Sequence, residues 1–411
     1  MARPPLTPDF ARYDDGLPMT AVAHDASFVT ITWAGGLVHR FHHLFLAESS
    51  VGEGVIDTVT RERLVEINAI DPDVRPASVA IDADGHLSIE WTPATPVAMA
   101  RFHKGWLRAL ATGAWRVDHD IPAPLPWNAT ILPALPIFDG RSVLTDDRVL
   151  KTSLETLCRT GVARLHSLPT DDETVARVAT RIGVIRETSF GRLFEVRSKP
   201  DPNSIAYTAH ALAPHTDLPT RELPPGFQLL HCRTNTCTDG HSVIVDGFTV
   251  AETLRQQNRA AFDNLVRVDW VHTNRSPDYD YRWSAPILDV DQSGRVNEVR
   301  LLNGLRTMPD VAEADVAAAY AALRAFTALS TQPALALRTL LAPGDLLIFD
   351  NRRILHGRDR FDARVGDRHL QGCYVDRDEV HSRLRVLARS ETRQPLPPAP
   401  PTSLRALAGP S

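Results

Sequence analysis

The pattern of apolar and polar positions changes along the chain, and the change predicts two domains. Residues 27–48 contain two short alternating segments around a Gly-Gly pair, and residues 83–91 give a turn followed by another alternating segment. This pattern is typical of a small β-rich domain, which we place at residues 1–105. From residue 106 onward helical and strand patterns follow one another, and residues 106–390 are expected to form a larger domain.

Several elements of the larger domain can be predicted individually. Helical periodicity with terminal signals predicts helices over 147–161, 173–183 and 311–330, and mostly helix over 245–268. Strands are predicted at 161–168, 337–351 and 369–376, and a hairpin around Gln-Ser-Gly is predicted within 287–302. Residues 391–411 are rich in proline and are expected to be a disordered tail.

Composition and charge narrow the classes of partner. The 411 residues include 45 Lys and Arg against 50 Asp and Glu, a net charge of −5, and the basic residues are scattered, which disfavours a nucleic-acid interface. No apolar run is long enough for a membrane helix, and no signal peptide is apparent, so no membrane partner is expected. Four cysteines without paired spacing fit a reducing cytoplasm. A small-molecule partner is favoured.

A His-x-Asp pair raises the question of a metal. In an extended segment His215 and Asp217 would point to the same side of the backbone, so their side chains could meet at one ion. Because the chain has 16 histidines, such a pair also arises by chance in a surface turn, and a third ligand is needed. His356 follows a predicted apolar strand and can supply it. Two histidines and one carboxylate form the facial triad of non-haem Fe(II) oxygenases, which leaves positions open for a cosubstrate and dioxygen.

An arginine in the next predicted strand fits the same chemistry. Arg368 follows His356 by twelve residues and lies where a guanidinium could reach back into the same cavity. A guanidinium grips a carboxylate with two parallel hydrogen bonds, so this is where a 2-oxo acid would be held. Taken singly, an arginine is more often a solvated surface charge.

These residues lie in stretches that resemble a known family. Residues 205–232, 240–248, 342–361 and 368–387 are similar, in order and approximate spacing, to the γ-butyrobetaine hydroxylase group of Fe(II)/2-oxoglutarate oxygenases, within the taurine-dioxygenase-like superfamily. The resemblance implies a mainly β fold with flanking helices, in which the catalytic domain is a double-stranded β-helix, or jelly roll. It also implies Fe(II), 2-oxoglutarate and O2 as the reactants at the centre, ascorbate as reductant, and a homodimer.

The resemblance also assigns the residues of the centre. It implies that His215, Asp217 and His356 are the iron ligands. Arg368 corresponds to the arginine that binds the distal carboxylate of 2-oxoglutarate, and Ser242 falls where related enzymes place a hydroxyl beside it.

The substrate is indicated by four aromatic positions. In the family an aromatic cage holds a quaternary ammonium group by cation–π attraction, and the matching residues are Phe190, Phe194, Tyr207 and Tyr374. Each of them could instead be a core residue. Ser204 and Asn303 fall where the family faces the substrate carboxylate, but Ser204 replaces an asparagine and Leu302 replaces the first of an Asn-Asn pair.

Several substrates and outcomes therefore remain open. γ-Butyrobetaine and a trimethylammonio-alkylphosphonate are both expected to fit a site that keeps the aromatic cage and differs from the family where the anionic group of the substrate binds. The alternatives are the same chemistry on a specialised metabolite, by hydroxylation, desaturation or ring formation, and a non-catalytic jelly-roll sensor.

The first domain departs from the family in one respect. The family has a structural zinc site with a cysteine-rich segment, and this chain lacks those cysteines. A domain without zinc is expected, held by a core of Trp33, Phe41, Phe45 and Trp91.

Overall fold

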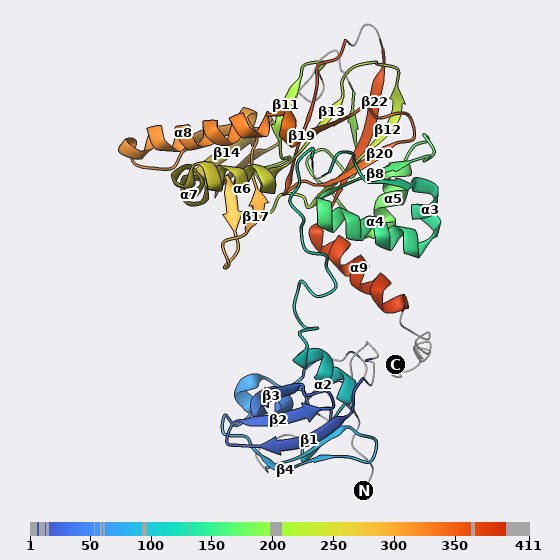
Figure 1. The fold of residues 1–411 in the computed structure, drawn as a ribbon, viewed down its shortest axis with the longest axis vertical. Coiled ribbons are helices and arrows are strands. Elements are labelled where there is room, and N and C mark those ends of the chain that lie inside the picture. The colour runs from blue at the N-terminus through green and yellow to red at the C-terminus, as the bar shows by residue number, and fades with distance from the viewer. Residues whose placement is uncertain are drawn as a thin grey trace, which may run out of the picture. The chain divides into compact units, whose positions relative to one another are not determined.

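The computed structural model shows two compact units, within residues 1–119 and 120–392 (Figure 1). The sequence pattern placed the domain boundary at 105/106. In the structure helix α2 (Lys104–Ala111) belongs to the first unit, because it buries Leu107 in the core of that unit. The residues that the structure describes are 6–7, 13, 16–52, 54–57, 60, 62–92, 97–130, 132–197, 208–362 and 366–391. The proline-rich tail beyond Glu391 lies outside them.

The first unit is built from antiparallel strands. Its sheets have the orders β1-β2-β3, with β1 (Met19–His24), β2 (Phe28–Trp33) and β3 (Val38–His42), and β4-β5-β6, with β4 (Pro76–Ile81), β5 (Leu87–Trp91) and β6 (Met99–Phe102). Gly35 and Gly36 form the turn between β2 and β3 with φ angles of 89° and 86°, which glycine adopts without strain. The chain then enters α1 (His43–Glu48), so the end of the predicted second strand is helical.

Aromatic side chains fill the core of this unit. Trp33, Phe41 and Trp91 are buried, and Trp91 donates from Nε1 to Ser50 Oγ at 3.2 Å. Phe45 is half-buried and stacks on Trp106 with ring centroids 5.9 Å apart. Large apolar residues on alternate strand positions therefore account for the folding of this unit.

The second unit is a jelly roll of two facing sheets. The larger sheet has the order β10-β22-β12-β20-β8-β7 and consists of β10 (Phe194–Val196), β22 (Arg368–Val375), β12 (Phe227–Asn235), β20 (Leu346–Asp350), β8 (Val162–His166) and β7 (Ile137–Asp139), with β9 (Ile185–Arg186) also on β22. The smaller sheet has the order β11-β21-β13-β19 and consists of β11 (Leu212–His215), β21 (Ile354–Arg358), β13 (Ser242–Asp246) and β19 (Ala336–Thr339). From β11 to β13 and from β19 to β22 the strands alternate between the two sheets, as in a double-stranded β-helix.

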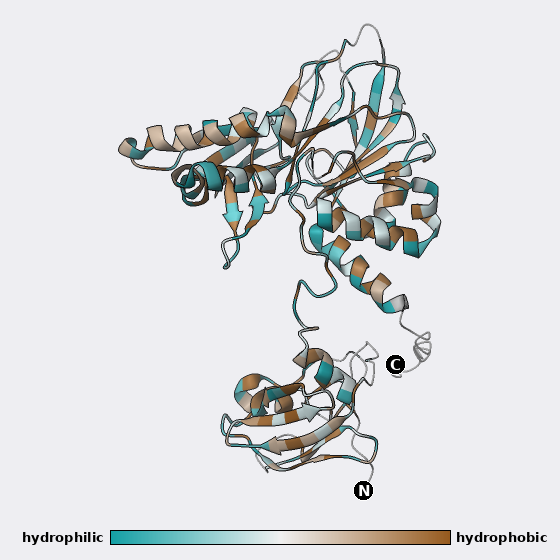
Figure 2. Ribbon diagram, viewed as in Figure 1, coloured by the Kyte–Doolittle hydropathy of each residue, from teal (hydrophilic) through white to brown (hydrophobic). Residues whose placement is uncertain are grey.

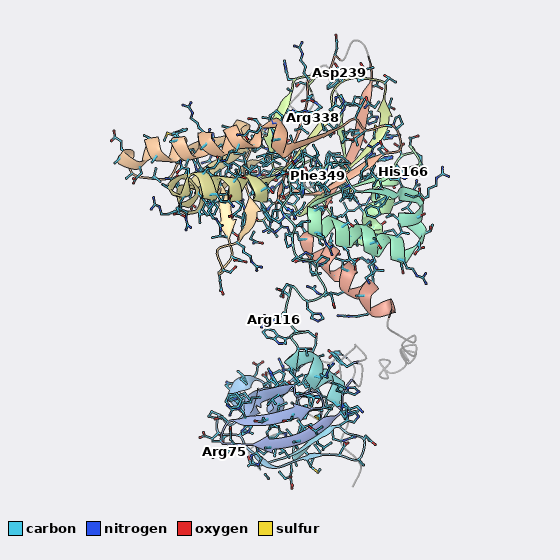
Figure 3. The ribbon with its side chains drawn as sticks, in the orientation of Figure 1. Arg75, Arg116, His166, Asp239, Arg338 and Phe349 are labelled. Atoms are coloured by element: carbon cyan, nitrogen blue, oxygen red, sulfur yellow. The ribbon has the colours of Figure 1, made fainter. Side chains whose placement is uncertain are left out.

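The strand β20 shows why the larger sheet is buried on both sides. Leu346 and Ile348 pack into the cluster beneath the helices, and Leu347 and Phe349 pack into the cluster between the sheets. Figure 3 shows Phe349 among densely packed side chains. A strand covered on both faces is apolar throughout, which explains the continuous apolar run in the sequence.

Helices cover the outer face of the larger sheet. They are α3 (Gly140–Thr145), α4 (Asp147–Thr160), α5 (Thr174–Ile182) and α9 (Arg377–Glu391). Figure 2 shows α4 and α5 with both apolar and polar positions, as expected of helices that cover a sheet on one side. The predictions of helices at 147–161 and 173–183 are confirmed. Helix α4 ends at Thr160 and is capped by Gly161, whose φ of 76° is left-handed, and β8 begins directly after this glycine.

An insertion between β13 and β19 adds a second layer of helices. Its elements are α6 (Gly247–Gln257), α7 (Arg259–Arg267), α8 (Glu313–Ser330), β14 (Asp269–Arg275), β15 (Asp280–Pro286), β18 (Arg306–Pro309) and the hairpin β16 (Leu288–Val290) with β17 (Val296–Val299). The three helices share one apolar cluster with β14, β16 and β17. The mostly helical segment 245–268 is divided at Asn258, whose side chain accepts from Ala261 N at 3.0 Å and caps α7. In the described part of the chain, no helix has the length and apolarity needed to cross a membrane.

Candidate active site

Two histidines from neighbouring strands begin the site. His215 ends β11 and His356 lies in β21, and the two residues are direct partners in the antiparallel pairing of these strands. Residues that face one another in this way point to the same side of the sheet, so their rings lie close, with centroids 4.3 Å apart. Phe349 of the opposite sheet packs on the His356 ring at 4.5 Å. The strand register therefore brings the imidazoles together.

Asp217 completes a compact group of potential ligands. Its Oδ1 lies 3.4 Å from His215 Nε2 and 3.6 Å from His356 Nε2. One ligand atom from each of the three residues lies within 4.8 Å of the others, and no further group of three such residues occurs in the described ranges. Strand β11 ends before Asp217, and Leu218 has a left-handed φ of 54°. Asp217 therefore lies in a bend after the strand and not in the extended segment that the sequence predicted.

Two side chains from elsewhere in the fold hold Asp217 in place. Buried Asn351 accepts from the Asp217 backbone N at 2.7 Å and donates through Nδ2 to the Asp217 carbonyl at 3.1 Å. The Tyr374 hydroxyl donates to Asp217 Oδ2 at 2.7 Å. One carboxylate oxygen is thus occupied by Tyr374, and the other, Oδ1, lies near the histidine Nε2 atoms. Such outer contacts orient a metal ligand before the metal arrives.

Charge interactions within the group keep a carboxylate beside the imidazoles. Burial by itself would raise the pKa of Asp217, but His356 and His215 lower it well below its usual value. Burial would lower the pKa of His215, and the neighbouring Asp217 raises it instead. Burial and the charge of His215 lower the pKa of His356. A metal would compete with the proton on His215, so its affinity should fall in acid.

The donor set fits a divalent iron. His215 donates from Nδ1 to the Ala213 carbonyl at 2.8 Å, which leaves Nε2 with a lone pair directed to the group. Two imidazole nitrogens and one carboxylate oxygen are the ligands of a facial triad, and the described cysteines lie outside the group. His215, Asp217 and His356 are therefore the residues that could hold the metal.

Buried arginine side chains lie between the same sheets. Arg368, Leu370 and Tyr374 are spaced by even numbers on β22, and Leu370 belongs to the core between the sheets, so all three face inward. Arg368 is 6 % exposed, and within the described residues no carboxylate forms an ion pair with it. Burial lowers its pKa. A buried guanidinium without a counterion is suited to bind an anionic ligand.

Arg358 and Ser242 lie on the facing sheet beside this arginine. They are direct partners in the β13–β21 pairing, two positions from the pair of Ile244 and His356, and therefore share the inner face with His356. Burial and the charge of Arg368 lower the pKa of Arg358 to about 10. Arg358 also donates to the carbonyls of Thr208 and His210 at 2.6 and 2.8 Å.

Comparisons with known proteins agree on one family. A family model described as "Taurine catabolism dioxygenase TauD, TfdA family" matches residues 123–374. The chain belongs to the TauD/TfdA family. It is 41 % identical over 375 residues to the gamma-butyrobetaine dioxygenase of Pseudomonas sp. (strain AK-1), which covers 90 % of this chain and 97 % of that protein. This TauD/TfdA protein is a 2-oxoglutarate-dependent non-haem iron dioxygenase.

Two further relatives of this TauD/TfdA dioxygenase extend the comparison. Human gamma-butyrobetaine dioxygenase is 38 % identical over 258 residues, 62 % of this chain and 67 % of that protein. The mitochondrial trimethyllysine dioxygenase of Rattus norvegicus is 29 % identical over 358 residues, 85 % of this chain and 83 % of that protein.

Three of the predicted substrate-binding aromatics gather beside the metal ligands of this TauD/TfdA dioxygenase. The ring centroids of Phe194 and Tyr374 are 5.1 Å apart, and those of Phe190 and Phe194 are 6.4 Å apart. They pack in one small cluster with Leu218. Because Tyr374 also contacts Asp217, the cluster adjoins the metal ligands directly.

The remaining predicted substrate residues are Tyr207, Ser204 and Asn303. Tyr207 and Ser204 lie outside the described residues. Asn303 is exposed at the start of a short 3₁₀ helix, and none of the described contacts joins it to the aromatic cluster.

Two residues of the TauD/TfdA site escaped the sequence analysis. Asn351 holds both backbone groups of Asp217, and its signal was a polar residue directly after β20, whose apolar run 346–349 ends in Asp350. Arg358 shares the face of His356, and the two-residue spacing in a strand could have indicated this. Neither inference was available without the strand boundaries.

Proposed function

We propose that this dioxygenase hydroxylates a small quaternary-ammonium compound of the betaine class, such as γ-butyrobetaine or a trimethylammonio-alkylphosphonate. The observation that carries the proposal is the contact between Tyr374 and Asp217, which places an aromatic cluster next to the candidate metal ligands. The names of the relatives, two gamma-butyrobetaine dioxygenases and a trimethyllysine dioxygenase, support this substrate class.

His215, Asp217 and His356 are proposed to hold Fe(II). Bound there, the ion supplies the activation of O2 that is coupled to oxidative decarboxylation of 2-oxoglutarate. The protein's part is to fix the ligands: strand register sets the two histidines, and Asn351 and Tyr374 set the carboxylate. A centre fixed before the reactants bind needs little reorganisation during the reaction.

Arg368 is proposed to bind the distal carboxylate of 2-oxoglutarate. Its burial and its lack of a carboxylate partner in the described part of the chain support this role, and Ser242 on the facing sheet supports it by offering a hydroxyl. Arg358 adds a second positive charge near the same place. The apolar core between the sheets, including Phe349, excludes water from the inner end of the site.

The aromatic cluster is proposed to receive the trimethylammonium group. Ring faces attract a cation without a counter-charge, and a trimethylammonium group buries methyl surface as it binds. Phe190 and Phe194 supply two of the rings, and Tyr374 supplies a third while its hydroxyl remains bonded to Asp217. Because phenylalanine attracts a cation less strongly than tryptophan, shape and apolar contact contribute much of the selectivity.

The test is O2 uptake and succinate formation by protein supplied with Fe(II), 2-oxoglutarate and ascorbate, the proposed reductant. A panel of trimethylammonium compounds is compared with neutral isosteres in which a tert-butyl group replaces the cation. Stimulation by the cations alone is expected, with loss of succinate formation in His356→Ala. Equal stimulation by the neutral isosteres, or activity in His356→Ala, contradicts the proposal.

The cytoplasm is the proposed location. Its support is that Cys158, Cys232, Cys237 and Cys373 are free thiols, as expected in a reducing compartment. A small molecule remains the proposed partner.

A further inference from the structure

A cavity of about 280 Å³ opens beside the aromatic cluster. Leu218, the residue that follows Asp217, lines this cavity and also packs with Phe194 and Tyr374. The lining also includes Arg186, Glu187, Ser189, Arg221 and Tyr281. The cavity is therefore separated from the proposed ammonium site by one side chain.

Arg221 presents a positive charge to this cavity. Its guanidinium carbon lies 3.4 Å from the centroid of the Tyr281 ring, and its Nη2 donates to Ser189 Oγ at 3.3 Å. Among the described residues no carboxylate forms an ion pair with it. Glu187 is the one acidic residue of the lining, and it is exposed to solvent. A guanidinium held by a ring and a hydroxyl retains donors for a further partner.

The other arginine of the lining is already neutralised. Arg186 forms an ion pair with Asp376 at 2.8 Å and donates to the Leu223 carbonyl at 2.6 Å. These contacts give Arg186 a structural role in the lining of the cavity. Arg221 is thus the cation of this cavity that has capacity for an anionic ligand.

The loop that carries Arg221 is held rigidly. Buried Arg300 donates to the carbonyls of Pro219, Arg221 and Glu222 at 3.1, 2.6 and 3.2 Å. Arg300 is itself fixed by an ion pair with Glu298 at 2.8 Å. The loop runs directly from Asp217, so the position of Arg221 relative to the metal ligands is set before any ligand binds. Preorganisation of this kind lowers the entropy cost of binding.

We propose that Arg221 binds the anionic end of the substrate, a carboxylate or phosphonate, while the aromatic cluster receives the ammonium end. This inference rests on the proposed function and deepens it, because it assigns the selection of a zwitterion to one residue. An arginine this close to the aromatic cluster would repel a simple cation. In a zwitterionic substrate the anionic group lies between the ammonium group and Arg221. The arginine then attracts the substrate, which binds in one orientation.

The experiment compares two ligands that differ only at the anionic end. γ-Butyrobetaine and butyltrimethylammonium are titrated by calorimetry, without O2, into protein loaded with Fe(II) and 2-oxoglutarate. Loss of a charge-assisted hydrogen bond predicts that Arg221→Gln weakens γ-butyrobetaine binding by about 10- to 100-fold. Butyltrimethylammonium binding should be unchanged or slightly stronger. Arg221→Lys should recover part of the affinity for the zwitterion.

The control is Arg192→Gln, which removes an exposed arginine from the neighbouring segment. It should leave both affinities unchanged, and unchanged 2-oxoglutarate binding verifies the fold of every variant. Equal losses for the two ligands in Arg221→Gln, or no loss for either, overturn the inference while the proposed function stands. Failure of the unaltered protein to bind either ligand overturns the proposed function, and the inference with it.

Discussion

The hydroxyl of Tyr374 donates to Oδ2 of Asp217 at 2.7 Å, and this bond joins the aromatic cluster to the metal ligands. Tyr374 contributes its ring to one group and its hydroxyl to the other. The metal and the substrate are therefore linked through one side chain, and changes in that side chain can be designed to separate the two roles.

Tyr374→Phe keeps the ring and removes the hydroxyl. Asp217 loses the contact that turns its Oδ1 to the histidines, so metal affinity is expected to fall by roughly 10- to 100-fold, the usual effect of losing a partner of a ligand. Titration with Fe(II), or with Co(II) followed by its absorption bands, measures this. The affinity for a trimethylammonium ligand, measured at saturating metal, should change little. Unaltered metal affinity would show that Asn351 alone positions the carboxylate.

Arg368→Leu removes the proposed partner of the distal carboxylate. The KM for 2-oxoglutarate is expected to rise by roughly 10- to 100-fold, because a charge-assisted contact in a buried site is lost. Weak turnover with 2-oxobutyrate, which lacks that carboxylate, should be unaffected. Arg338→Leu, at an exposed arginine of β19, is the matched control and should leave both cosubstrates unchanged. A KM that stays constant in Arg368→Leu contradicts the assignment.

Phe190 is the half-buried ring of the aromatic cluster and can be altered with least damage to packing. Phe190→Leu should raise the KM for the trimethylammonium substrate by about 3- to 10-fold, the value of one cation–π contact, and leave the KM for the oxo-acid cosubstrate unchanged. Phe190→Trp should lower the KM for the trimethylammonium substrate. Steady-state succinate formation measures both effects, and parallel changes in the two KM values would place Phe190 in the core instead.

His272 makes stability depend on pH. It is fully buried in β14, where burial and the charges of Arg300 and Arg306 lower its pKa from 6.5 to about 4. Between these values the unfolded chain binds a proton that the folded chain does not, so the free energy of unfolding falls as the pH falls. From pH 7 to pH 5 this residue should account for a loss of about 2 kcal/mol.

Urea unfolding of His272→Leu measures this contribution. The variant should lose about 2 kcal/mol less than the unaltered protein over the same pH change, because leucine binds no proton. His231, which is also buried and whose pKa burial lowers to about 4, is present in both proteins and cancels in the comparison. Equal pH dependence of the two proteins would contradict the assignment.

The sequence was most informative where one strand or one helix determines the outcome. The terminal glycine of α4 and the apolar run of β20 reflect local preferences. Helix α4 forms where it was predicted, and the strand predicted over 337–351 divides into β19 and β20. The spacing of His215, Asp217 and His356 with Arg368 indicated the chemistry because few other arrangements use that set.

What escaped the sequence depends on contacts between distant segments. Asn351 reaches Asp217 across 134 positions of the chain, and the Tyr374 hydroxyl reaches it across 157. Arg221 would count as one surface arginine among many until the fold places it beside Tyr281 and the cavity. Such contacts follow from sheet order and loop path, which periodicity along the chain does not encode.

The pairing of His215 with His356 has a consequence for the sheet itself. Strand β11 is the edge of the smaller sheet, and its pairing with β21 is irregular between Leu212 and His215. An ion bound by both histidines would link β11 to β21 at this edge of the sheet, where the strand pairing is irregular. Withdrawal of iron should therefore increase amide exchange in β11 before the buried strands respond, and leave an open edge to which other chains can pair.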